Sequence, residues 1–195
     1  MDAERHRSRA QSVRREIGLA ALIAIATANG CKENRWVPRG RAELVLSEIR
    51  LRGPEGVSRR IDSDEDFAKT VLDGIASGDS VWLQVAAQLK PASASAEASF
   101  DIALASALPR SPSRVLALLD GEYTAEEVCG MPFLKADSSE VISYHDQAVR
   151  ALSGVKDSSL VSTIEACRAA LDSSRGRRLE RVDPSYVTKN KPGRR

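Results

Sequence analysis

Residues 63–91 read SDEDFAKTVLDGIASGDSVWLQVAAQLKP, and this stretch indicates the fold class. Apolar residues recur at helical spacing in both of its halves, and a Gly-Asp turn at residues 78–79 separates them. Ser63 and Asp66 form a capping-box-like start for the first half, and the apolar stripe of the second half includes Trp82, which we expect in the core. Two helices joined by so short a turn are expected to pack as an αα-hairpin.

The same spacing recurs on both sides of this hairpin. Residues 41–52 fit helix and strand templates almost equally, and we favour a helix because Ala, Glu, Leu and Arg are good helix formers. Gly53-Pro54-Glu55-Gly56 is expected to end this element. Further helices are predicted over residues 94–108, 111–119, 138–152 and 157–171, with a short one after the Thr124-x-x-Glu127 capping box.

These patterns predict an all-α fold. Aromatic residues make up only 4% of the chain, and runs of β-branched residues in alternation are hard to find. A chain of 195 residues is long enough for one domain with a real core. We expect a compact array of six or seven short helices packed as αα-hairpins, after an N-terminal signal or anchor helix.

The N-terminus resembles a targeting segment. Residues 17–28 read IGLAALIAIATA, twelve residues without a charge, directly after a stretch that contains five arginines. This is the pattern of a secretory signal, and it is short for a membrane-spanning helix, which needs about 20 apolar residues. Ala28 ends an A-x-A-like cleavage site, and residues 28–31 resemble a lipobox whose Cys31 is the lipidation candidate. The alternative is a buried N-terminal helix of a cytosolic protein, with Asn29-Gly30 as its C-cap.

Charge is distributed unevenly along the chain. Residues 175–195 carry eight basic and two acidic side chains, whereas residues 17–174 carry 16 basic and 22 acidic ones. The acidic body makes a broad nucleic-acid-binding face unlikely. We expect four parts: a signal or anchor over 1–31, a linker and first element over 32–62, a helical domain over 63–174, and a disordered basic tail over 175–195. Contact of that tail with anionic lipid or nucleic acid is the alternative.

Three cysteines remain to be assigned. If the chain is exported and Cys31 is lipidated or removed, Cys129 and Cys167 form an even pair in an oxidising compartment, and we expect them to form a disulfide. Cys167 lies on the apolar stripe of the last helix, where such a bond would be buried. The alternative is two free, buried thiols. No C-x-x-C pairing occurs, and the cysteines match no zinc spacing, so no metal site is expected.

Few residues carry recognisable chemistry. His145 is predicted on or beside the apolar stripe of a helix, as a hydrogen-bonded core or boundary group and not as a base. The sequence lacks a nucleophile elbow, a P-loop and a dinucleotide-binding glycine pattern, so neither a catalytic residue nor a cofactor is expected. The acidic residues 62–66 fit helix capping better than a calcium loop. A hydrolase that uses buried carboxylates stays possible because sequence alone does not place carboxylates together.

Residues 71–91 (VLDGIASGDSVWLQVAAQLKP), the alanine-rich helix that ends in LPR, the VCGMPF motif and a late cysteine carry a resemblance. Over about residues 64–171 the chain resembles uncharacterised exported, lipoprotein-like α-helical proteins of proteobacteria. The resemblance implies a periplasmic or cell-envelope location and a cysteine pair, and it carries no activity. We therefore expect a non-enzymatic protein-binding, accessory or immunity-like factor, associated with the membrane through Cys31 or residues 17–28. The alternative is a cytosolic helical protein whose basic tail contacts nucleic acid.

Overall fold

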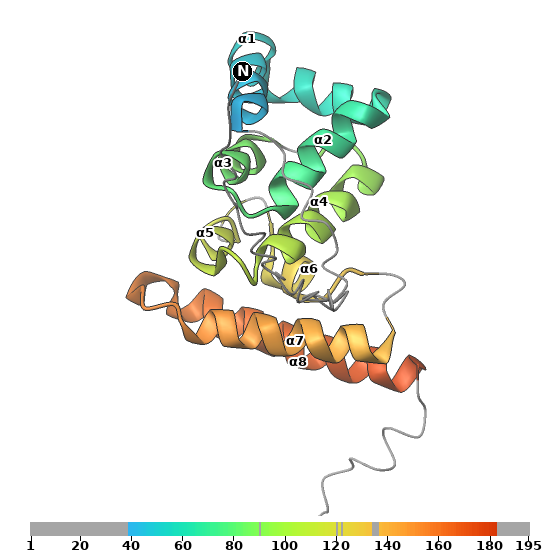
Figure 1. Ribbon diagram of the computed structural model, residues 1–195, viewed down its shortest axis with the longest axis vertical. Coiled ribbons are helices and arrows are strands. Elements are labelled where there is room, and N and C mark those ends of the chain that lie inside the picture. The colour runs from blue at the N-terminus through green and yellow to red at the C-terminus, as the bar shows by residue number, and fades with distance from the viewer. Residues whose placement is uncertain (1–38, 90, 120, 122, 134–136, 183–195) are drawn as a thin grey trace, which may run out of the picture. The chain divides into compact units, whose positions relative to one another are not determined.

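The computed structural model describes residues 39–89, 91–119, 121, 123–133 and 137–182, all within the unit that spans Asn34–Arg195. These residues form eight α-helices and one 3-10 turn without any strand, which confirms the predicted all-α class with eight helices in place of six or seven (Figure 1). The elements are α1 (Arg39–Ser63), α2 (Glu65–Ala76), α3 (Ser80–Gln88), α4 (Ala94–Ala107), α5 (Pro112–Leu116), α6 (Ala125–Cys129), α7 (Ser138–Ser153), η1 (Ser158–Leu160) and α8 (Val161–Val182).

Helix α1 is longer than the sequence indicated. Residues 41–52 are helical, as favoured, but the expected end of the element is a kink at Gly53, where φ is +73°. Glycine adopts this conformation without steric cost, and the chain resumes its helix at Pro54 because proline is preorganised for a first helical turn. The first element therefore does not end at residues 53–56, as the sequence predicted, but continues as a helix to Ser63.

The start of α2 also corrects a prediction. Its N-cap is Asp64 and not Ser63, since the Asp64 carboxylate accepts a hydrogen bond of 3.0 Å from the Phe67 amide. Ser63 instead donates its hydroxyl to the Arg59 carbonyl at the end of α1. Glu65 and Asp66 lie in the first turn of α2, which is favourable because carboxylates interact well with the helix dipole there. The capping interpretation of residues 62–66 is thus confirmed.

The helices form an ordered stack. The α2–α3 hairpin forms as predicted, but α2 packs most extensively on α4 and α3 packs most extensively on α1. Helix α1 contacts α2 and α3 at one end of the stack (Figure 1). Helices α7 and α8 lie side by side at the opposite end, and α6 lies between α4 and α8 (Figure 1).

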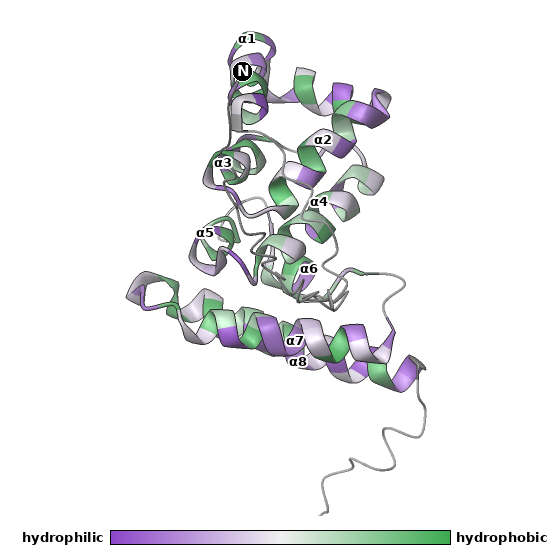
Figure 2. Ribbon diagram, viewed as in Figure 1, coloured by the Kyte–Doolittle hydropathy of each residue, from purple (hydrophilic) through white to green (hydrophobic). Residues whose placement is uncertain are grey.

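One continuous apolar core joins the helices from α1 to α8. Trp82 has no exposed surface, which confirms its predicted core position. Figure 2 shows that each helix combines hydrophobic and hydrophilic residues, as expected for helices that bury one face. The largest fully buried side chains are Trp82, Phe100, Ile75, Leu89, Leu104, Leu108, Leu116, Met131, Leu152, Leu171, Leu179 and Val57.

The C-terminal boundary differs from the sequence-based expectation. Helix α8 continues to Val182, so residues 175–182, which we assigned to a disordered tail, are helical. Leu179 holds this extension on the core, with 1% of its surface exposed. The Arg178 guanidinium also donates a hydrogen bond to the Phe133 carbonyl. Residues 183–195 lie outside the described part of the chain.

We predict that Gly74→Ala destabilises the protein by about 2–3 kcal/mol, although alanine favours helices. A Cβ atom at this α2 position would overlap the indole ring of Trp82, which is itself fully buried and unable to move aside cheaply. Urea denaturation followed by circular dichroism measures the change in the free energy of unfolding.

Gly176→Ala in α8 is the matched control, because a Cβ atom there meets nothing within 4 Å. This variant is expected to gain about 0.5–1 kcal/mol from helix propensity alone. Equal responses of the two variants would contradict the close packing of α2 on Trp82.

Candidate functional site

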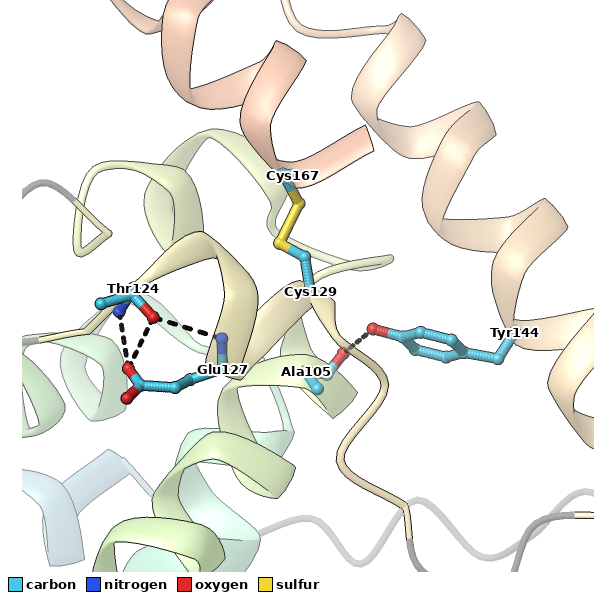
Figure 3. Close-up of a disulfide and its surroundings, with 6 residues drawn as sticks. All are labelled: Ala105, Thr124, Glu127, Cys129, Tyr144 and Cys167. Atoms are coloured by element: carbon cyan, nitrogen blue, oxygen red, sulfur yellow. Dashed lines mark hydrogen bonds between the residues drawn. A yellow bond between two sulfur atoms is a disulfide. The ribbon is translucent and has the colours of Figure 1, made fainter. Parts of the chain in front are cut away.

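The short helix α6 is joined covalently to α8. The sulfur atoms of Cys129 and Cys167 lie 2.02 Å apart, which confirms the predicted disulfide (Figure 3). Cys129 ends α6, and Cys167 faces it from the buried side of α8. Neither cysteine has exposed surface. The bond is therefore shielded from soluble reductants, and it is structural in character.

The N-terminus of α6 is held by the capping box predicted from the sequence. The Glu127 amide donates to the Thr124 hydroxyl at 3.2 Å, and the Thr124 amide donates to the Glu127 carboxylate at 3.1 Å (Figure 3). The Thr124 hydroxyl also donates to the same carboxylate at 2.7 Å. Both ends of α6 are thus tied, one by hydrogen bonds and one by the disulfide.

Tyr144 connects α7 with the inner helices. Its hydroxyl donates to the Ala105 carbonyl in α4 at 2.9 Å (Figure 3), and its ring packs edge-on against Phe133 at a centroid distance of 4.8 Å. Burial raises the pKa of the Tyr144 phenol far above its usual value. The phenol is therefore a neutral hydrogen-bond donor at every physiological pH.

A shallow groove follows the contact between α6 and α8. Its volume is about 240 Å³, and its lining residues are Ala125, Glu126, Ala166, Ala170, Ser173 and Arg177. The three alanines and Ser173 form a floor of small side chains, with a carboxylate and a guanidinium beside it. Small-molecule pockets usually measure roughly 300–1,000 Å³ and are more enclosed, so this groove is better suited to side chains of a macromolecular partner.

His145 is a buried link between α7 and α8. Its Nε2 atom lies 2.7 Å from an oxygen of Asp172, and its Nδ1 atom lies 3.2 Å from an oxygen of Asp146. A general base needs an accessible ring nitrogen, whereas both nitrogens of this ring are occupied by carboxylates and the residue is only 6% exposed. The predicted hydrogen-bonded core or boundary position is confirmed.

Asp101 is the buried carboxylate that sequence reasoning missed. It lies on α4 with 7% of its surface exposed, and its Oδ1 atom has no hydrogen-bond partner among the described residues. Burial raises the pKa of this carboxyl from 3.8 to about 6, and repulsion from Glu127 and Glu97 adds to the effect. An aspartate inside the alanine-rich α4 was the available sequence signal, because its neighbours Ala105 and Phe100 are core residues.

The remaining predictions concern the N-terminal segment, metal binding and membrane spans. Cys31 and Ala28, the lipidation and cleavage candidates, lie outside the described residues. Within the described ranges, no group of three or more His, Cys, Asp or Glu side chains is arranged to hold a metal ion. None of the described helices is both long enough and apolar enough to cross a membrane.

Comparison of the chain with protein-family models, with curated proteins and with solved structures found no match in any of the three. The resemblance to exported proteobacterial proteins thus stays a prediction. The functional proposal rests on the residues and contacts of this chain.

We predict that Asp101→Asn stabilises the protein by about 1–2 kcal/mol near pH 8, because a neutral amide avoids burying a charge beside two other carboxylates. The folded state binds the Asp101 proton more tightly than the unfolded state does. The wild-type free energy of unfolding should therefore fall as the pH rises from about 4 to about 6, and the variant should lack that part of the slope.

Urea titrations from about pH 4 to about pH 8 measure both effects. Glu97→Gln should change the stability in the same direction by a smaller amount, because Glu97 is exposed and acts on Asp101 only through its charge. A variant Asp101→Asn that is less stable than wild type at alkaline pH would contradict the uncompensated burial of this carboxylate.

Proposed function

We propose that this chain is a non-enzymatic, envelope-associated helical protein that binds a protein partner. The observation that carries the proposal is the buried Cys129–Cys167 disulfide. Disulfides form and persist in oxidising compartments. A small domain buries a limited apolar core, so a disulfide adds stability that the core alone does not provide. The charge-free residues 17–28 and Cys31 offer the means of export and attachment.

The protein-binding part of the proposal is supported by the groove between α6 and α8. Its floor of alanines allows a partner's backbone or side chains to approach closely, and Glu126 and Arg177 offer charges of both signs beside it. The disulfide and the capping box hold α6 in place, so this surface is preorganised and little ordering entropy is lost on binding. A partner that presents an apolar helix or loop with flanking charges fits these features.

The compartment is tested by intact-mass spectrometry of the protein purified from its native host, with and without reduction and alkylation. We expect a chain that begins at Asn29 or at a lipidated Cys31 and that is two hydrogens lighter than its reduced form. An uncleaved chain with three alkylatable thiols would overturn the proposal and favour the cytosolic alternative, in which the basic tail contacts nucleic acid.

The partner surface is tested by photo-cross-linking in the native host. A cross-linking amino acid at Ser173, in the groove, is expected to yield a defined adduct with one protein. The same group at Glu165, an exposed position on another face of α8, is the control and should not yield that adduct.

Substitutions within and beside the groove test whether the Ser173 adduct depends on binding in the groove. Ala166→Arg fills the floor and should abolish the Ser173 adduct, whereas Glu165→Arg, the adjacent exposed substitution, should preserve it. Adducts that persist in Ala166→Arg, or that appear equally from position 165, would contradict a partner in this groove.

A further inference from the structure

Helix α1 exposes two leucines that the fold leaves uncovered. Leu44 and Leu51 are 70% and 85% exposed. They lie seven residues apart, which is about two helical turns or 10 Å, and so point to the same side of α1. Together with Ser47 between them they form what we call the α1 outer face.

The outward direction of these leucines is imposed by the opposite face of the helix. Val45, Leu46 and Ile49 are buried in the core, together with Ala42, which has no exposed surface. Rotating α1 to cover the leucines would expose these four residues. The α1 outer face is therefore a stable property of the folded domain.

Charged side chains flank this face, three arginines together with the carboxylates of Glu43 and Glu48. Arg41, Arg50 and Arg52 are all exposed on the same part of α1. The nearby Glu48 is engaged by Arg60 at 2.8 Å and by Arg52 at 3.4 Å, so its charge is offset. A helix face that combines leucines with flanking arginines matches the chemistry of an anionic lipid surface, where apolar groups enter the acyl boundary and arginines bind headgroups.

The position of α1 in the chain brings it near any membrane that holds the N-terminal segment. Residues 29–38 separate the apolar residues 17–28 from the start of α1 at Arg39. Ten residues span at most about 35 Å when fully extended. Helix α1 also lies at the end of the stack opposite to α7 and α8 (Figure 1).

We propose that the α1 outer face rests on the lipid surface, with Leu44 and Leu51 at the headgroup boundary and Arg41 and Arg50 on anionic headgroups. This inference rests on the proposed envelope association and adds an orientation to it. A second copy of the chain is the weaker occupant, because two leucines offer far less than the roughly 800 Å² per partner of a stable protein interface. In this orientation α6 and α8, which line the groove, lie toward the other end of the helical stack from α1.

The test uses the full chain with Cys31→Ser, so that a single introduced cysteine is labelled and the buried disulfide is left intact. An environment-sensitive fluorophore at Ser47→Cys reports on the α1 outer face without removing either leucine. The same label at Glu165→Cys on α8 is the control position. Vesicles contain phosphatidylcholine with the anionic lipid phosphatidylglycerol, and brominated acyl chains serve as the quencher.

We expect the label at position 47 to shift to shorter wavelength and to be quenched by the brominated lipid, and the label at position 165 to show neither effect. Adding Leu44→Ser and Leu51→Ser should abolish the quenching at position 47. The matched variant Val161→Ser removes the other large exposed hydrophobic side chain among the described residues and should leave the quenching unchanged.

Co-flotation with the vesicles separates failure of this inference from failure of the proposed function. A protein that floats with the vesicles while the label at position 47 stays solvent-like would overturn the orientation and leave the anchoring intact. A protein that does not float at all would overturn the lipid contact of α1, and the proposed function would still be tested by the intact mass and by the cross-link at Ser173. Quenching that survives the double serine variant, or that requires a second copy of the chain, would also contradict lipid contact through the leucines.

Discussion

The fold depends on the constraint that holds α6 between the inner helices and the α7–α8 pair. Helix α6 has five residues, too few to be stable alone, because helix formation in water requires roughly 12–15 residues even in good sequences. The capping box fixes its start and the Cys129–Cys167 disulfide fixes its end. The two cysteines are separated by 38 residues, and closing a loop of this length stabilises the fold by about 3–4 kcal/mol in the chain-entropy model. Without α6, little would join α8 to α4.

Buried polar groups differ in how well the domain compensates them. Tyr144 and His145 cross between helices and find partners at 2.9 Å and 2.7 Å, so their desolvation is offset by hydrogen bonds. Asp101 is compensated less well, since one of its oxygens has no partner among the described residues and two further carboxylates act on it. The buried indole nitrogen of Trp82 likewise has no hydrogen-bond partner among the described residues. The free-energy cost of burying the Asp101 carboxylate falls when the group is protonated on acidification.

The two ends of the helical stack have different surface chemistry. Helix α1 presents leucines and arginines at one end, whereas the α6–α8 contact presents small side chains with one charge of each sign at the other. The proposed lipid contact at the first end and the proposed partner binding at the second are compatible, because α1 and the α7–α8 pair lie at opposite ends of the stack (Figure 1).

Helix periodicity, the capping residues and the cysteine pair could be predicted from the sequence, because they depend on local spacing and on redox chemistry. The sequence alone determined the all-α class, the Thr124 capping box and the core position of Trp82. It predicted the Cys129–Cys167 pairing only on the condition of export, with two free thiols as the alternative. Tertiary packing decided the rest. It selected which leucines of α1 are buried, extended α8 through Leu179 beyond the expected boundary, and placed Asp101 beside Glu127. These outcomes depend on which helix faces which, and periodicity shows that a face is apolar without showing how much of it a neighbouring helix covers.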